Sequence, residues 1–240
     1  MEGQKSRYAS IPLLFSDAIC MRLTGKPPND PLPLVEHIVP DWRERFLKSL
    51  AWPCAFLRVI SWSICIIEAI VILAYHFPSL SASHFVLSTL DFNGHTHGIV
   101  ITPLFLLGNV LTIAGTLIRL CCYRVLGRLF TFELSIHQDH CLIVRGPYAI
   151  VRHPSYTGMI LTILGAICSQ STGSWVMECG LIDMWFGKGL VMYWLLVAAA
   201  VVASLLFRIS VEDRLLHRKF GREWTEWNQK VPYVLIPGVY

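Results

Sequence analysis

The sequence carries little charge for a chain of its length. Charged residues make up 15% of its 240 residues, against about 25% in a typical soluble domain, and hydrophobic residues make up 54%. Two long stretches, 59–118 and 153–187, contain neither Lys nor Arg. This composition excludes an ordinary soluble domain and predicts an integral membrane protein.

Patterns typical of other protein classes are also missing. The eight cysteines form no C-x-x-C pair, and most lie in apolar runs, so packing explains them better than a disulfide or zinc framework. The formal net charge is only +4 and there is no basic tract, which argues against a nucleic-acid partner. His140 and His153 lack the spacing of a helical or hairpin metal site, so we expect no metal.

Four apolar runs predict transmembrane helices. They cover residues 51–77, 98–122, 156–170 and 189–207. The third is shorter than the about 20 residues that span a bilayer, so we expect it to continue towards Trp175 or to tilt. A run at 11–20 predicts a short or re-entrant helix. The expected fold is therefore all-α, with four transmembrane helices and room for a fifth, short N-terminal helix.

The segments between these runs carry further expectations. Residues 41–50 and 208–228 predict amphipathic helices at the membrane surface, the second interrupted by Gly221. Residues 78–97 are polar and predict a loop, and Pro103 interrupts the second apolar run. Glu68, inside the first run, is either a satisfied polar residue of the bundle, which we favour, or part of a polar pathway.

The distribution of Lys and Arg predicts the orientation in the membrane. These residues cluster before the first span, between the second and third, and after the fourth. Because cytoplasmic loops carry an excess of Lys and Arg, both termini and the polar segments 123–156 and 208–240 are expected on the cytosolic side.

Two polar blocks carry the residues that could perform chemistry. The first polar block, 139–158, contains Gly146-Pro147-Tyr148 and Arg152-His153-Pro154-Ser155-Tyr156-x-Gly158. The second polar block, 208–240, contains Arg208-x-x-x-Glu212-Asp213 and Phe220-Gly221-x-x-Trp224-x-x-Trp227. Polar groups are costly beside lipid, so both blocks should line a cavity or the membrane surface.

Each feature also has a structural explanation of its own. An i,i+4 ion pair accounts for Arg208 and Glu212, and helix boundaries account for Pro147 and Pro154. Aromatic residues such as Tyr148 are common in the belts at membrane interfaces. It is the presence of both blocks, in this order and on one expected face, that favours a site.

Together the two blocks resemble the isoprenylcysteine carboxyl methyltransferase family, roughly over residues 131–240. The resemblance implies S-adenosyl-L-methionine as methyl donor and the prenylated C-terminal cysteine of a protein or peptide as acceptor. It also implies a multi-pass protein of the endoplasmic reticulum membrane, whose cytosolic cofactor pocket is formed by the C-terminal part. The chain then divides into an N-terminal region at 1–50, membrane helices at 51–122 and a catalytic region at 123–240.

The resemblance assigns roles by position. It implies that Arg208 is the catalytic and substrate-binding residue that meets the acceptor carboxylate. The residues that it implies for cofactor binding are Glu133, His140, Cys141, Leu142, Ile143, Tyr148, His153, Pro154, Ser155, Tyr156 and Glu212. There are three departures from the family pattern: Asp213 where many members have Glu, Glu133 where some have Gln, and the conservative changes Cys141 and Ile143.

The chemistry is consistent with these residues. A C-terminal carboxylate has a pKa of about 3.3–3.7 and is ionised at neutral pH, so its methylation needs alignment rather than a general base. Three alternatives remain. They are a membrane methyltransferase acting on phospholipids, amines or small molecules, an NADPH-dependent sterol reductase, whose family carries a similar RHPxYxG pattern, and a membrane scaffold without turnover.

Overall fold

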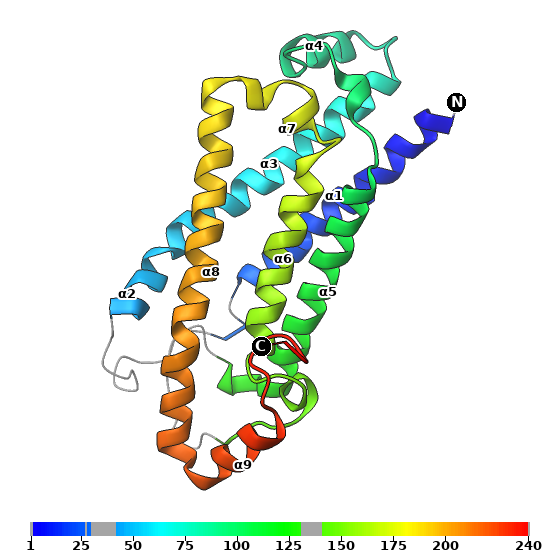
Figure 1. Cartoon of the computed structure of the whole chain (residues 1–240). Helices are drawn as coiled ribbons and strands as arrows, with labels where there is room; N and C mark the ends of the chain where they lie inside the picture. Colours follow the sequence, from blue (N-terminus) through cyan, green and yellow to red (C-terminus); the bar gives the residue numbers. More distant parts are fainter. Residues whose placement is uncertain (1, 27, 30–41, 131–140, 240) are drawn as a thin grey trace.

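The computed structural model describes residues 2–26, 28–29, 42–130 and 141–239. In these ranges the regular structure is entirely helical, and no strand forms, which confirms the all-α expectation. In Figure 1, α5, α6 and α8 run roughly side by side in one direction, and α1 and α3 cross them obliquely. The helices, in chain order, are α1 Glu2–Gly25, α2 Trp42–Ser49, α3 Ala51–His76, α4 Ser81–Leu90, α5 Pro103–Leu126, α6 Pro154–Ser171, α7 Trp175–Glu178, α8 Trp185–Phe220 and α9 Arg222–Lys230. Short 3₁₀ turns lie between several of them, including Gly146–Ala149 before α6 and Leu181–Asp183 before α8.

Three helical stretches of the described chain are long and apolar enough to cross a membrane. They are α3, the stretch Pro103–Leu129 that contains α5, and α8. The expected fourth span, the run 156–170, forms α6 but is not confirmed as a span. Polar residues at both ends of this 18-residue helix, such as Ser155 and Gln170, reduce its apolar length.

Helix α6 instead packs along α5 through glycines. Gly108 and Gly115 of α5 face Gly165 and Gly158 of α6, and a Cβ atom at any of the four would collide with the backbone of the other helix. Glycine at these positions lets two helical backbones approach closely, as small residues do in membrane proteins. We call these four residues the glycine seam. Their close packing holds the start of α6 against the end of α5.

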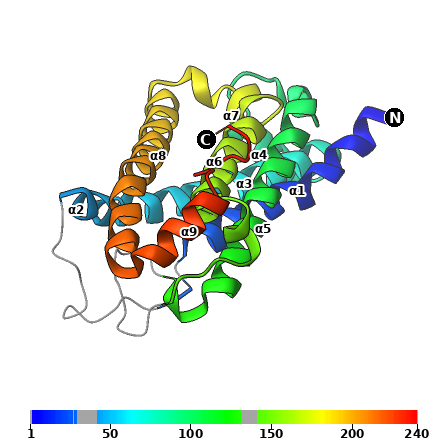
Figure 2. The ribbon, with the colours of Figure 1, turned by 60° about the horizontal axis from the view of Figure 1, so that its bottom comes forward.

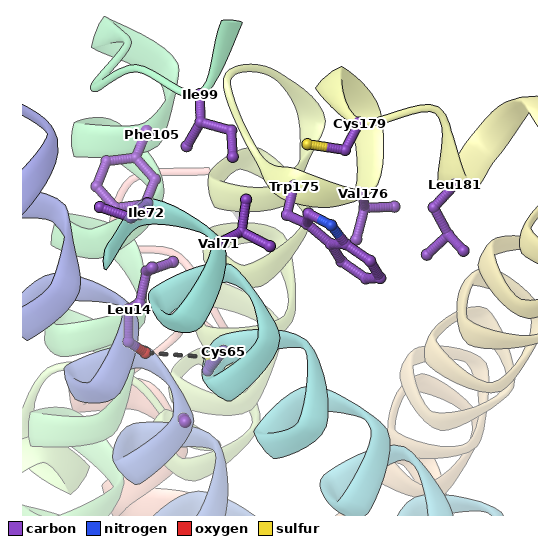
Figure 3. Packing of buried hydrophobic residues seen from close by; sticks show 11 residues of the cluster. Leu14, Cys65, Val71, Ile72, Ile99, Phe105, Trp175, Val176, Cys179 and Leu181 are labelled. Carbon is purple, nitrogen blue, oxygen red and sulfur yellow. Dashed lines mark hydrogen bonds between the residues drawn. The ribbon is translucent and has the colours of Figure 1, made fainter. Parts of the chain in front are cut away.

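An apolar core lies at the end of the bundle where α3 leads into α4 and α7 precedes α8. Its fully or nearly fully buried members come from distant parts of the chain (Figure 3). They include Leu14 of α1, Ile72 of α3, Phe105 of α5 and Trp175 of α7. Glu68 is 2% exposed here and accepts a hydrogen bond from Trp175 N at 3.1 Å, which confirms its interpretation as a satisfied polar residue.

The structure corrects three expectations about local elements. Residues 78–97 are not all loop, because Ser81–Leu90 forms α4, whose Val86, Leu87 and Leu90 pack against the apolar core. Pro103 does not interrupt a helix: it begins α5, after an N-cap in which Thr102 accepts a hydrogen bond from Phe105 N. The fourth apolar run and the start of the second polar block are one unbroken helix, α8.

The N-terminal region also differs from expectation. The helix α1 is 24 residues long, because the helix continues on both sides of the apolar run 11–20. Figure 1 shows the start of α1 near the end of the bundle that holds α4 and α7, away from the C-terminus, and a common membrane face for both termini stays a prediction. The predicted helix at 41–50 is confirmed by α2, and its place at the membrane surface stays a prediction.

The end of the bundle that holds the C-terminus is where the two polar blocks meet. Gly221, with φ of 51°, ends α8 and begins α9, as predicted for the interruption in 208–228. Figure 2, with this end turned forward, shows α9 and the last residues lying across the start of α6. The fold therefore brings 146–158 and 208–239 together.

Candidate active site

The start of α6 is fixed by the last residues of the chain. We call residues 231–239 the C-terminal strap. Its carbonyl oxygens accept hydrogen bonds from Arg152 N and His153 N, in each case at 2.9 Å, and from Thr157 Oγ1 at 2.7 Å. Arg152 N and His153 N precede α6, which begins at Pro154, so they have no partner within that helix and the strap supplies their acceptors.

Side chains of α6 and α8 then join the two blocks directly. The hydroxyl of Tyr156 donates to Glu212 Oε2 at 2.5 Å. His153 Nε2 lies 3.0 Å from Asp213 Oδ1, and its Nδ1 lies 4.0 Å from Glu212 Oε2. These contacts, with the Arg208 contact described next, define the α6–α8 cluster: His153, Tyr156, Arg208, Glu212 and Asp213. Residues that are more than fifty positions apart in sequence thus face one small region.

Arg208 lies one helical turn before Glu212 on α8. Its Nε is 3.8 Å from Glu212 Oε2, and the residue is 9% exposed, while the Glu212 side chain is 30% exposed. An i,i+4 ion pair therefore exists, as the structural explanation proposes. It is not the whole arrangement, because the same carboxylate oxygen accepts the hydrogen bond from Tyr156. The guanidinium is held at the edge of a carboxylate that is already oriented by another helix.

The aromatic rings of the α6–α8 cluster are arranged in parallel. His153 and Tyr156 stack with ring centroids 5.3 Å apart and an interplanar angle of 18°. His153 is buried at 6% exposed. Faces of this kind attract cations and stack on planar rings. The stack stands beside the only partly covered carboxylate of Glu212, so the cluster combines an aromatic surface with a hydrogen-bond acceptor.

Arg152 connects the cluster to α9. Its Nη1 lies 3.2 Å from Asp213 Oδ2 and donates to Asn228 Oδ1 at 2.5 Å. Its guanidinium carbon lies 6.0 Å from the centre of the Trp224 ring. The remaining Nε of Arg152 and the Nε1 of Trp224 are buried and have no hydrogen-bond partner among the described residues. Two buried donors thus remain available at this site.

Tyr148 belongs to the 3₁₀ turn that precedes α6. Its carbonyl oxygen accepts a hydrogen bond from Trp227 Nε1 at 3.2 Å, which ties the turn to α9. Burial raises the pKa of Tyr148 well above its ordinary value, and the charges of Cys122 and Glu212 act in the same direction. The phenol therefore stays protonated at neutral pH and can serve as a hydrogen-bond donor.

The other residues that the resemblance implies for cofactor binding differ in how deeply they are buried. Pro154 and Ser155 are buried in the first turn of α6, and Ser155 faces α5 rather than α8. Cys141 is exposed, and Leu142 and Ile143 are half-buried on the segment that leads to the Tyr148 turn. Glu133 and His140 lie outside the described residues. Contact of these side chains with a cofactor stays a prediction.

Sequence reasoning missed two parts of the site. Arg119 belongs to the positive residues between the second and third apolar runs that predict only orientation, yet it is buried and bonds to Ser155 in the first polar block. The link from Arg152 to Asn228 was also unforeseen. A signal for Arg119 was present, because a cation at the inner end of an apolar run needs a polar partner.

The polar and aromatic groups of the site can be compared with the chemistry of S-adenosyl-L-methionine. That molecule combines a sulfonium cation, an adenine ring, ribose hydroxyls and an amino-acid carboxylate. The stacked His153 and Tyr156 rings suit the cation or the base, and Glu212 suits a hydroxyl or amino donor. The free Nε of Arg152 and Nε1 of Trp224 suit a carboxylate or a ring nitrogen. The residues present fit this donor, and among the described residues no group of three His, Cys, Asp or Glu side chains could hold a metal ion.

Comparison with known proteins agrees with the sequence resemblance. Residues 107–179 match the model of the isoprenylcysteine carboxyl methyltransferase (ICMT) family, which covers the first polar block but not the second. The chain is 33% identical over 129 residues to protein-S-isoprenylcysteine O-methyltransferase B of Arabidopsis thaliana, an alignment that covers 52% of this chain and 55% of that protein. A probable protein-S-isoprenylcysteine O-methyltransferase of Oryza sativa subsp. indica is 33% identical over 128 residues, covering 52% and 56%.

A reductase shares part of the same pattern. The Delta(14)-sterol reductase of Mus musculus is 31% identical over 99 residues, which cover 41% of this chain but only 20% of the reductase. The chain spans about half the length of the curated methyltransferases that it matches. The resemblance to the isoprenylcysteine carboxyl methyltransferase family, first indicated by the two polar blocks, is thereby confirmed.

Proposed function

We propose that this chain is a membrane methyltransferase that transfers a methyl group from S-adenosyl-L-methionine to the C-terminal carboxylate of a prenylated cysteine. The observation that carries the proposal is the α6–α8 cluster, in which Tyr156 of the first polar block donates to Glu212 of the second beside Arg208. The match to the methyltransferase family over 107–179 and the three apolar helices support it.

The chain's own residues would supply binding and alignment. Arg208, at the polar end of an apolar helix, is suited to hold the carboxylate of an acceptor whose lipid tail lies in the bilayer. Glu212 and the His153–Tyr156 stack would orient the donor on the adjoining side. Because the acceptor carboxylate is already ionised, no side chain has to remove a proton.

The chemistry that the donor supplies when bound is an electrophilic methyl group on a sulfonium. The acceptor oxygen forms the new C–O bond as the C–S bond breaks, leaving a neutral thioether and a methyl ester. The protein's contribution to the rate is to bring oxygen, methyl carbon and sulfur into line, which is the proximity effect of a two-substrate site. The partial exposure of Glu212 leaves its carboxylate accessible to such a ligand.

We also propose that the site faces the cytosol of an endoplasmic reticulum membrane. Arg and Lys residues are present at the end of the bundle that holds the α6–α8 cluster, in the last turns of α5 and α8 and in α9. Positive residues favour the cytosolic side. The organelle itself follows from the family resemblance alone.

The test uses the full chain in detergent or vesicles with methyl-labelled S-adenosyl-L-methionine. Farnesylated N-acetylcysteine should yield a base-labile methyl ester. Two matched acceptors serve as controls: unprenylated N-acetylcysteine and the farnesylated C-terminal amide, which keeps the lipid but lacks the nucleophilic carboxylate. Labelling of the amide at the same rate as the acid, or no ester from folded protein, would refute the proposal.

The similarity to a sterol reductase makes reduction the second candidate function. A reductase would consume NADPH in the presence of an unsaturated sterol and would not bind S-adenosylhomocysteine. A phospholipid, amine or small-molecule methyltransferase would bind S-adenosylhomocysteine but label a different acceptor. A scaffold would do neither. Calorimetry with S-adenosylhomocysteine, followed by an acceptor panel, separates the four possibilities.

A further inference from the structure

Arg119 of α5 lies buried beside the first turn of α6. It is 3% exposed, and arginine is almost never buried to this extent unless it is paired. Its Nη1 donates to the carbonyl oxygen of Ser155 at 3.0 Å and lies 3.1 Å from Ser155 Oγ. One guanidinium nitrogen thus holds both the backbone and the side chain of a single residue.

The glycine seam between α5 and α6 makes this contact possible. A Cβ atom on Gly158 would lie 2.8 Å from Arg119 Cγ, closer than real side chains allow. The stem of Arg119 therefore passes over Gly158 to reach Ser155 one turn earlier. The sequence R-H-P-S-Y-x-G contains both ends of this arrangement, the serine that is held and the glycine that leaves room.

On its other side the arginine is anchored to α5 and α1. Its Nε donates to Tyr123 OH at 3.0 Å, and that hydroxyl donates to Thr24 O at 3.1 Å. The guanidinium carbon also lies 5.3 Å from the Tyr123 ring centre. A planar guanidinium with fixed donor directions is well suited to join several partners in one geometry.

Ser155 lies between the two residues of the site that come from α6. His153 precedes it by two positions and Tyr156 follows it, and these are the residues that contact Asp213 and Glu212. The first turn of α6 begins with a proline and has few intrahelical partners of its own. A charge-assisted contact to Ser155 O therefore limits how this turn can rotate about the helix axis.

We propose that Arg119 is a positioning residue that controls the affinity for the methyl donor. Its hydrogen bonds from α5 to Ser155 set the orientation of His153 and Tyr156. The inference rests on the proposed function for the identity of the donor. Arg119 acts through Ser155, the residue at the start of α6 that its guanidinium contacts. It should therefore matter for the donor and not for the acceptor carboxylate, which Arg208 holds on the other helix.

The test is Arg119→Lys, which keeps the charge but loses the planar fork. The dissociation constant of S-adenosylhomocysteine, measured by calorimetry, should rise on the order of tenfold, the scale seen when a group that orients a binding side chain is removed. The KM for farnesylated N-acetylcysteine should not change. Ser155→Ala, which removes only the hydroxyl contact, should give a smaller rise. Arg124→Lys, the same exchange at an exposed position of α5, should bind like the original chain.

The outcomes separate the two proposals. Unchanged donor affinity in Arg119→Lys, or equal changes in the donor and acceptor constants, would overturn the positioning role. If Arg119→Lys does not fold, Ser155→Ala alone must weaken binding of S-adenosylhomocysteine, or the role is wrong. If the original chain binds S-adenosylhomocysteine but forms no prenylcysteine ester, the acceptor assignment is wrong. The positioning role is then still tested by the dissociation constant of S-adenosylhomocysteine in Arg119→Lys relative to that of the original chain. If the original chain does not bind S-adenosylhomocysteine, both the proposed function and the positioning role are wrong.

Discussion

The two ends of the helical bundle are held together by different forces. At one end, Leu14, Ile72, Phe105 and Trp175 form a buried apolar core. At the other end, hydrogen bonds and ion pairs, such as that from Tyr156 to Glu212, join distant segments beside a small apolar cluster of Ile209, Val234 and Leu235. The apolar core gains stability from the burial of surface and from close packing, which no ligand replaces.

The polar end differs because its partners are partly exposed. The side chain of Glu212 is 30% exposed and that of Asp213 is 16% exposed, so solvent or a ligand can reach groups that hold the two blocks together. The comparison teaches that stability and function should be separable in this molecule. Substitutions at the apolar end should affect folding, and substitutions at the polar end should affect binding and turnover.

The largest expected effect is the loss of stability in Ile72→Ala. Ile72 is 1% exposed, and truncating a buried aliphatic side chain of this size costs about 2–5 kcal/mol. Thermal unfolding in detergent measures it, with Ile70→Ala, on a 41% exposed position of the same helix, as control. Binding of S-adenosylhomocysteine to the folded fraction should be unchanged. Equal losses of stability in the two variants would break the distinction between the ends.

The next effect divides the roles within the α6–α8 cluster. Arg208→Ala should raise the KM for farnesylated N-acetylcysteine, and Glu212→Ala should raise the dissociation constant of S-adenosylhomocysteine, each about 100-fold, because each removes one partner of a buried or half-buried charged contact. Arg214→Ala, an exposed arginine of α8, serves as control. If both variants changed both constants alike, the division between donor and acceptor sides would be wrong.

A smaller effect is expected from Asp213→Asn. This change weakens the contacts to Arg152 and His153 while it keeps the size of the side chain. The kcat/KM for methylation should fall about tenfold, since a hydrogen bond to a charged group is worth roughly 1.5–3 kcal/mol and part of the network remains. Asp213→Glu keeps the charge and should recover part of the activity. If Asp213→Asn left kcat/KM unchanged, the contacts of Asp213 with Arg152 and His153 would be dispensable for turnover.

The smallest effect concerns the pH dependence of stability. The folded protein holds the proton of Tyr148 at a pKa raised by burial, whereas the unfolded chain releases it at a pKa of about 10. The folded state then binds more protons, so stability falls as pH rises from about 10 towards the folded pKa. Tyr148→Phe should reduce this slope in thermal unfolding measured across that range. An unchanged slope would show that another group is responsible.

Much of the fold could be predicted from local pattern. The low charge and long apolar runs indicated a helical membrane protein, and Gly221 marked the break between α8 and α9. The errors arose where tertiary contacts decide. Residues 81–90 form α4 because Val86, Leu87 and Leu90 find an apolar core to pack on, and a polar average over 78–97 cannot reveal that.

The candidate site could be predicted in part. The residues of the two blocks were identified from sequence, and the structure places His153 Nδ1 within 4.0 Å of Glu212 Oε2. The contact of Arg152 with Asn228 was not predicted, because it pairs two side chains 76 positions apart. The hydrogen bonds of the C-terminal strap were not predicted either, because backbone carbonyl oxygens leave no residue-specific signal. The burial of Arg119 was not predicted either, since it depends on the approach of α5 and α6.

The sequence by itself determined that the chain is helical, apolar over long stretches and equipped with two polar blocks, because composition and spacing act locally along the chain. Only the tertiary structure decided that Tyr156 meets Glu212 and that Arg119 reaches Ser155. These pairs are separated by dozens of residues. Their meeting depends on how closely the glycine seam lets α5 and α6 approach and on where the C-terminal strap returns.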